Sequence, residues 1–154
     1  MTLSFASLGL SEERAQHLKT LGFTEPTQIQ SEAIPHLLSG RDVVGLAQTG
    51  TGKTAAFSLP ILEQVDPNKR AVQALVLTPT RELAMQVSQA VETLNTSDRL
   101  RVAAVYGGQS IGAQIHQLRR GAQFVVGTPG RVQDLLKREA LVLDQLNWLV
   151  LDEA

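Results

Sequence analysis

Eight consecutive residues have the types and spacing of a loop that binds phosphate: Ala47, Gln48, Thr49, Gly50, Thr51, Gly52, Lys53 and Thr54. Glycines let the backbone curl so that successive N–H groups face an anion, and a helix that begins near Lys53 adds the positive end of its dipole. We expect Lys53 to reach the β- and γ-phosphates of a nucleotide and the Thr54 hydroxyl to ligate Mg²⁺. Ala47 stands where the usual pattern has its first glycine. The alternative is an ordinary Gly-Thr turn, but the full octet between an apolar run and a helical segment favours a phosphate loop.

An acidic pair, Asp152 and Glu153, directly follows the apolar residues 149–151. On its own such a pair is more often the solvated start of a loop. Beside a phosphate loop, one carboxylate can hold Mg²⁺ while another group orients the attacking water. We therefore assign Asp152 to the metal, through a water molecule, and Glu153 to the water nucleophile.

Predicted helices and strands, which must position these residues, alternate along the chain. Short apolar runs separated by helices are typical of parallel strands that are buried on both faces. The pattern therefore predicts an α/β fold with helices on both faces of a mostly parallel sheet. Ser11 is a good cap for the first helix, and Pro35 is expected to kink or break the second. Helices are predicted at 11–21, 26–38, 53–65, 80–94, 110–120 and 129–137, and buried strands at 43–47, 74–77, 102–106, 124–126 and 148–151.

Composition limits the class of protein. The 154 residues suit one domain, and 43% hydrophobic with 19% charged residues exclude a disordered polymer. A net charge of −1 gives no global basic field. Without cysteine, disulfides, thiolate metal sites and cysteine catalysis are excluded. The start of the chain lacks the features of a signal peptide, so we expect a cytoplasmic protein.

Six short strings follow one another in the order known from one family. Residues 22–30 are similar to a Q motif, with Phe5 as the isolated aromatic before it; 47–54 match motif I, 79–83 motif Ia, 107–108 a GG motif, 128–131 motif Ib, and 152–154 the first three letters of motif II. Together they resemble the first, RecA-like domain of DEAD-box ATP-dependent RNA helicases. The resemblance covers nearly the whole chain and implies a RecA-like phosphate-loop NTPase fold.

The resemblance implies ATP with Mg²⁺ as the nucleotide. Gln30 would hydrogen-bond the adenine edge and Phe23 would stack on the ring, and an amide, which has both a donor and an acceptor, would favour adenine over guanine. The alternative for Gln30 is a polar residue on a helix surface. The implied catalytic residues are Lys53, Asp152 and Glu153, and Phe23, Gln30 and residues 47–54 would bind ATP.

The resemblance also implies RNA as a partner. Two of the implied contact segments lie where a helix begins, so free N–H groups and an arginine can bind a phosphate. Contacts to backbone and 2′-OH groups predict little sequence specificity. The alternatives are a capped helix for Thr80 and a tight turn at 107–108. The implied RNA-binding residues are Pro79, Thr80, Arg81, Gly107, Gly108, Thr128, Pro129, Gly130 and Arg131.

Motif III and the second RecA-like domain of that family have no counterpart in these residues. We therefore expect residues 1–40 to form a helical Q-motif region, residues 41–154 to be an incomplete RecA-like domain without its C-terminal strands, and the fragment to be inactive alone. An absent strand between 43–47 and 148–151 would leave two unpaired edges, so the isolated chain should aggregate or fold loosely. A non-catalytic ATP- or RNA-binding remnant and an unrelated phosphate-loop ATPase are the alternatives.

Overall fold

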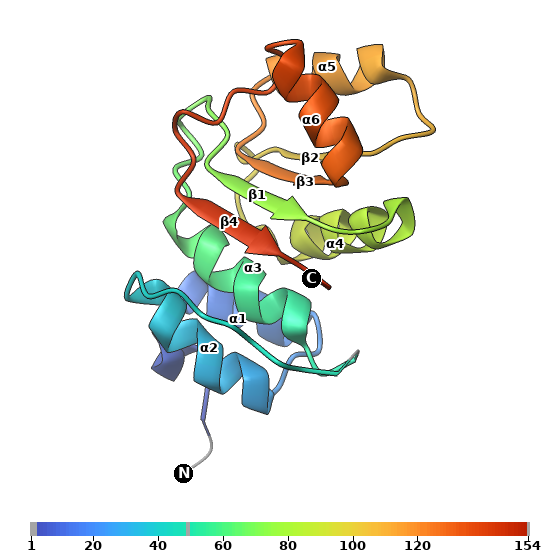
Figure 1. Cartoon of the computed structure of the whole chain (residues 1–154). Coiled ribbons are helices and arrows are strands. Elements are labelled where there is room, and N and C mark those ends of the chain that lie inside the picture. The colour runs from blue at the N-terminus through green and yellow to red at the C-terminus, as the bar shows by residue number, and fades with distance from the viewer. Residues whose placement is uncertain (1–2, 49, 154) are drawn as a thin grey trace. The chain divides into compact units, whose positions relative to one another are not determined.

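The computed structural model describes residues 3–48 and 50–153, and Figure 1 shows its elements in order. The chain forms two compact units. The first comprises the residues up to Gln64 together with Leu94–Thr96, and the second comprises Val65–Thr93 and the residues from Ser97 onward. The predicted division at residue 40 falls inside the first unit.

The first unit is helical, and its helices begin where capping residues stand. It contains a short 3-10 helix, Ala6–Leu8, followed by α1 (Glu12–Thr20), α2 (Gln28–Leu38) and α3 (Lys53–Gln64). The side chain of Ser11 accepts a hydrogen bond from the Arg14 backbone N–H at the start of α1, as predicted. The α2 helix runs through Pro35 to Leu38, so the predicted break is absent. A proline removes only one backbone hydrogen bond, and α2 ends three residues later.

The second unit contains the sheet. Its strands are β1 (Ala74–Leu77), β2 (Val102–Val105), β3 (Phe124–Gly127) and β4 (Trp148–Leu151), and its helices are α4 (Arg81–Leu94), α5 (Ile111–Arg119) and α6 (Pro129–Lys137). All paired strands are parallel, in the order β2-β3-β1-β4. This confirms the predicted α/β class with a parallel sheet.

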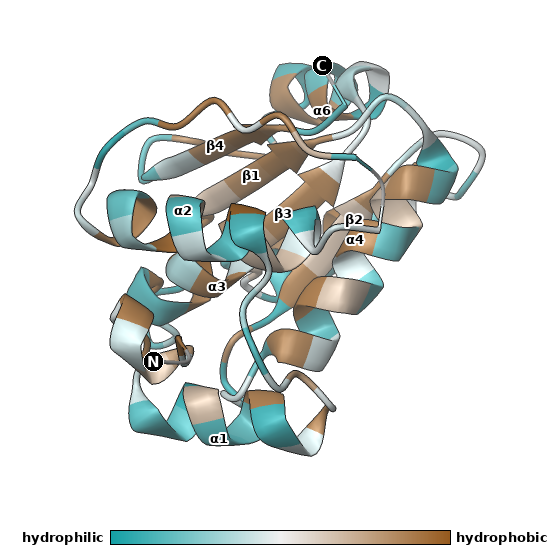
Figure 2. Ribbon diagram, turned by 90° about the horizontal axis from the view of Figure 1, so that it is seen from below, coloured by the Kyte–Doolittle hydropathy of each residue, from teal (hydrophilic) through white to brown (hydrophobic). Residues whose placement is uncertain are grey.

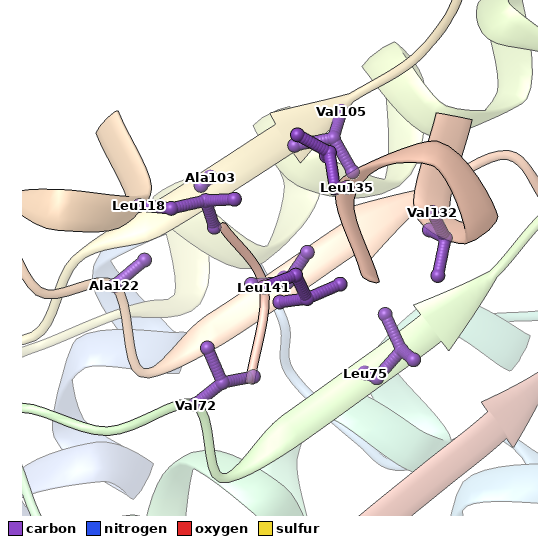
Figure 3. Packing of buried hydrophobic residues seen from close by; sticks show 10 residues of the cluster. Val72, Leu75, Ala103, Val105, Leu118, Ala122, Val132, Leu135 and Leu141 are labelled. Carbon is purple, nitrogen blue, oxygen red and sulfur yellow. The ribbon is translucent and has the colours of Figure 1, made fainter. Parts of the chain in front are cut away.

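Helices cover both faces of this sheet. In Figure 1, α5 and α6 lie on one face and α4 on the other. Beneath α5 and α6, Leu118, Val132 and Leu135 pack in a buried cluster with strand residues such as Leu75 and Val125, and Figure 3 shows this packing. Figure 2 shows hydrophobic residues in all four strands, and burial is greatest in β1 and β3, the two central strands. The core therefore holds the carboxyl ends of the strands in a fixed register.

Two predicted strands differ from the expectation. Residues 41–48 form no strand, and Val44 and Leu46 are 93% and 92% exposed. The β4 strand forms but is only half buried, with Leu149 58% and Leu151 61% exposed. A strand is stable only where neighbouring strands accept and donate its backbone hydrogen bonds, and β4 has one neighbour, β1. The described sheet therefore has four strands where five were predicted.

None of the helices in the described part of the chain is both long enough and apolar enough to cross a bilayer.

Candidate functional site

The predicted phosphate loop lies in the first unit and leads directly into α3, which begins at Lys53. Gly50 and Gly52 have φ values of +86° and +84°, in the left-handed region that glycine adopts without strain. The Thr51 hydroxyl donates a hydrogen bond of 2.6 Å to the carbonyl of Gln48 and closes the turn. Thr49 lies outside the described residues. Residues 50–52 thus form a turn that leads into a 12-residue helix, the arrangement that binds phosphate in other proteins.

Gln30 connects the start of α2 to this loop. Its Oε1 accepts a hydrogen bond of 2.9 Å from the Thr27 backbone N–H, which completes a capping box. Its Nε2 donates one of 3.1 Å to the carbonyl of Gly52. The side chain of Gln30 is 1% exposed, so the alternative of a polar residue on a helix surface is wrong. A Cβ atom at position 52 would overlap the Gln30 amide, so only glycine allows this approach.

Phe23 is held beside an aromatic partner. Gly22, with φ +90°, follows the C-terminal cap of α1, and the Phe23 N–H donates to the Leu18 carbonyl at 2.9 Å. The ring of Phe23 meets that of buried Phe5 edge to face, with 6.2 Å between the ring centroids. Phe5, the isolated aromatic of the sequence, therefore fixes the position of Phe23.

The other predicted site residues lie at the carboxyl edge of the sheet in the second unit. Residues 78–81, 106–109, 128–131 and 152–153 follow β1, β2, β3 and β4 in turn, and parallel strands bring their carboxyl ends to one edge. Backbone hydrogen bonds continue past the strands: the N–H groups of Thr78, Thr128 and Asp152 donate to the carbonyls of Gly127, Val105 and Leu77, respectively. This edge is the part of a parallel sheet where ligands bind.

Asp152 and Glu153 differ in their surroundings although they are adjacent. Asp152 is buried and its backbone is tied to Leu77 by a hydrogen bond of 2.9 Å. Glu153 is exposed and has φ +60°, so the chain turns sharply after Asp152. The two adjacent residues therefore occupy different environments.

Two arginines flank the loop that follows β2. A Cβ atom at Gly108 would come within 2.7 Å of Arg81 Nη1, so the guanidinium of Arg81 lies against this glycine. From the other segment, Arg131 Nη1 donates to the carbonyl of Gln109 at 3.2 Å. The structure thus brings together Arg81, Gly108 and Arg131, three predicted RNA-binding residues from separate motifs.

The helices that begin at this edge differ in their caps. The Thr80 hydroxyl accepts a hydrogen bond of 3.2 Å from the Leu83 N–H, so the capped helix proposed as the alternative is present. The Thr128 side chain makes no capping hydrogen bond, and Pro129 occupies the first turn of α6. The N–H groups of Gly130 and Arg131 lie in that same turn, where backbone donors lack intrahelical partners. The start of α6 is therefore the more open of the two to an anion.

Two residues of this edge were missed by sequence reasoning. Gln114 of α5 is buried and accepts a 2.8 Å hydrogen bond from Arg131 Nη1. Gly127 ends β3, and a Cβ atom there would meet Val105 Cγ2 at 2.6 Å and the Val105 carbonyl oxygen at 2.9 Å. A polar side chain at the helical spacing of the apolar residues Ile111, Ile115 and Leu118 could have indicated Gln114. Nothing in the sequence distinguishes Gly127 from a residue of an ordinary apolar strand.

An ion pair away from these motifs secures the first unit. Arg14 is buried, and its Nε lies 2.9 Å from Glu63 Oε2. The same guanidinium donates to the carbonyls of Leu62 and Leu94, each at 3.2 Å. Burial raises the pKa of Glu63, but hydrogen bonds from Arg14 and from the Ser11 N–H, together with the Arg14 charge, outweigh it and lower this pKa below its ordinary value. Arg14 thus anchors α1 to the end of α3, the helix that follows the phosphate loop.

Comparison with known proteins gives consistent results. The model of the DEAD/DEAH box helicase family matches residues 27–154. The chain is 58% identical, over all of its length and 31% of the relative, to the RNA helicase CrhR of Synechocystis. It is 55% identical, over 98% of its length and 24% of the relative, to the ATP-dependent RNA helicase DeaD of Escherichia coli K12.

A solved structure shares the fold. It is the crystal structure of a DEAD box protein from the hyperthermophile Methanococcus jannaschii, with a TM-score of 0.91 and 41% identity over 96% of this chain and 40% of that one. The chain spans less than a third of the length of the curated relatives named above. The match of the family model to residues 27–154 shows that this chain belongs to the DEAD/DEAH box helicase family.

Proposed function

We propose that the intact protein is an ATP-dependent RNA helicase that binds Mg-ATP and the RNA backbone and couples ATP hydrolysis to local duplex unwinding. The observation that carries this proposal is that one chain of this family has two features. A glycine turn at 50–52 leads into α3, and Arg81 and Arg131 lie beside residues 108–109 at the carboxyl edge of the sheet. CrhR and DeaD, the relatives described above, are named as RNA helicases.

The phosphate loop fits a nucleotide with Mg²⁺. A Cβ atom at Gly50 would meet nothing within 4 Å, so the backbone there is open to a close approach by phosphate oxygens. Lys53, in the first turn of α3, supplies a positive charge for them, and the Thr54 hydroxyl is a suitable oxygen ligand for Mg²⁺. When bound, Mg²⁺ neutralises the charge that develops on the phosphates. Asp152 would hold the metal through a water molecule, and its burial keeps the carboxylate in one place.

Glu153 is proposed to act on the attacking water. Its carboxylate can accept a proton from that water and orient its lone pair. Glu153 follows the end of β4 and has a left-handed backbone conformation (φ +60°), so it does not continue the strand. In this proposal Asp152 positions the metal and Glu153 positions the attacking water.

Adenine recognition by Gln30 is compatible with the contacts that Gln30 already makes. Its Oε1 and Nε2 each form one hydrogen bond within the protein, and an amide can form up to four. Within the described residues one lone pair and one N–H of this amide have no partner, and because the side chain is only 1% exposed, the adenine edge would reach them after a local shift of the residues that cover it. The ring of Phe23, held by Phe5, would stack on the base.

Arg81 and Arg131 are proposed to bind RNA phosphates, together with Pro79, Thr80, Thr128, Pro129 and Gly130. Gly107 would let the RNA backbone approach closely, since a Cβ atom there would meet nothing within 4 Å, whereas at Gly108 the Arg81 guanidinium already lies against the backbone and would itself meet the phosphate. These residues offer charges and backbone N–H groups but no array of side chains for base edges. Little sequence specificity follows.

The test compares two variants of the intact protein. Glu153→Gln should keep ATP binding but slow RNA-stimulated hydrolysis by about 10²-fold or more, since a neutral amide is a poor base. Lys53→Ala should weaken ATP binding by about 1.5–3 kcal/mol, since it removes a charged hydrogen-bond donor. Binding is measured by titration with a fluorescent ATP analogue and hydrolysis by phosphate release.

Glu92→Gln is the matched control, because Glu92 is an exposed carboxylate on α4 outside the proposed site. Hydrolysis by Glu153→Gln at the wild-type rate would contradict the role of Glu153. Unchanged ATP affinity of Lys53→Ala would contradict the nucleotide site as a whole.

A further inference from the structure

We infer that Gln114 is a positioning residue for RNA binding, which acts by fixing the orientation of Arg131. The inference rests on the proposed function, because it assumes that Arg131 binds a phosphate of RNA. Gln114 lies on α5, outside all the motifs of the sequence.

Both polar atoms of the Gln114 side chain are in use. Oε1 accepts a hydrogen bond of 2.8 Å from Arg131 Nη1, and Nε2 donates one of 3.0 Å to the carbonyl of Tyr106. The side chain is buried, where an unsatisfied amide is costly. Gln114 is therefore held by the end of β2 and in turn holds the arginine that follows β3.

The contacts of Arg131 leave one side of its guanidinium open. Nη1 makes two hydrogen bonds, to Gln114 and to the carbonyl of Gln109. Within the described residues, Nε and Nη2 have no hydrogen-bond partner. These two atoms form the side-on pair that matches two oxygens of one phosphate. Gln114 thus accepts a hydrogen bond from Nη1, the nitrogen that a side-on contact with phosphate does not use.

Holding the Arg131 side chain in place before RNA binds should strengthen RNA binding. A free arginine side chain loses rotamer freedom when it binds a ligand, and a side chain already held in place loses less. Removing Gln114 should therefore weaken RNA binding through Arg131 while the chemistry at the phosphate loop is unaffected. The effect should appear in the RNA concentration needed for half-maximal hydrolysis and not in the rate at saturating RNA.

The experiment uses the intact protein and oligouridine as the RNA probe. Gln114→Met has nearly the same size but cannot form either hydrogen bond. It should raise the half-saturating RNA concentration about threefold to tenfold, with an unchanged rate at saturating RNA. The control is Gln117→Met, because Gln117 is an exposed glutamine on the same helix, and it should leave both values unchanged.

A double variant shows whether Gln114 acts through Arg131. If it does, Gln114→Met should have no further effect once Arg131→Ala is present. Additive effects of the two substitutions would overturn the inference. If Arg131→Ala weakens RNA binding but Gln114→Met does not, the inference is also wrong, whereas the proposed role of Arg131 stands. If Arg131→Ala itself leaves RNA binding unchanged, the proposed function of Arg131 fails.

A second pair of variants covers the case in which Gln114→Met does not fold. Gln114→Glu keeps the acceptor for Arg131 but places a negative charge 2.8 Å from it, which reduces the attraction of Arg131 for phosphate. It should weaken RNA binding more than Gln117→Glu, and the difference should vanish when Arg131→Ala is present. Equal losses of RNA affinity in Gln114→Glu and Gln117→Glu would contradict the proposal that Gln114 acts on an RNA-binding arginine.

Discussion

The tripeptide Val-Val-Gly occurs twice in this chain, and its two copies have different structures. At 125–127 it forms most of β3, where both valines are completely buried. At 43–45 it belongs to an irregular segment that leads toward the phosphate loop, and Val44 is almost fully exposed. Identical residues thus form a central strand in one unit and an exposed connection in the other.

The two Val-Val-Gly segments differ in structure because of their neighbouring strands and helices, not because of the strand propensity of valine. The β3 strand has parallel partners on both sides, β1 and β2, and helices on both faces of the sheet. The segment at 43–45 belongs to no described ladder. Valine favours strands because it fits a pleated, half-buried surface, so without such a surface the preference has little effect.

The largest expected effect comes from placing a charge in each copy. Val126→Asp would bury a carboxylate without a partner, and we expect a loss of about 3–5 kcal/mol or more in the free energy of unfolding. That is a large fraction of the roughly 5–15 kcal/mol by which an ordinary domain is stable. Val44→Asp should change it by no more than about 0.5 kcal/mol. Both are measured by urea denaturation; an equal loss would show that residues 43–45 are buried in solution.

A smaller effect is expected from the glycine of each copy. Gly127→Ala would place a Cβ atom 2.6 Å from Val105 Cγ2 and 2.9 Å from the Val105 carbonyl oxygen, so the ends of β2 and β3 must move apart. We expect a loss of about 1–3 kcal/mol. At Gly45 the nearest atom to an added Cβ is Ile29 Cδ1 at 3.4 Å, an ordinary contact. Gly45→Ala should therefore be close to neutral in thermal and urea melts, and equal losses would contradict the comparison.

The smallest effect concerns the ion pair that anchors the helices of the first unit. Because the folded pKa of Glu63 is lowered, its contribution is fully present above the ordinary carboxylate pKa and is lost as the pH falls through the lower folded value. The loss should be at most about 1 kcal/mol between roughly pH 5 and pH 3, since solvent screens a partly exposed pair. Urea melts across this range measure it.

Glu63→Gln should remove this part of the acid sensitivity, whereas Glu92→Gln should not. Identical pH profiles for the wild type and Glu63→Gln would show that the pair contributes nothing to stability.

Much of the candidate site could be predicted because it depends on local rules. A phosphate loop is defined by consecutive residues, and the helix start at Lys53 together with the left-handed conformations of Gly50 and Gly52 follows from them. Gln114 could not be predicted in the same way, since its two partners, Tyr106 and Arg131, belong to other elements. The burial of Gln30 likewise depends on Gly52, 22 residues away.

The sequence by itself determined where the helices begin, the order of the motifs and the α/β class, because caps such as Ser11 and Ser110 and the turns at glycines act over three or four residues. Only the tertiary structure decided which apolar runs become buried strands and which polar side chains are held inside. Backbone hydrogen bonds between strands, and the contacts of Gln114 with Tyr106 and Arg131, join residues far apart in the chain. Their presence depends on which neighbours the fold supplies, and no local pattern of residues contains that information.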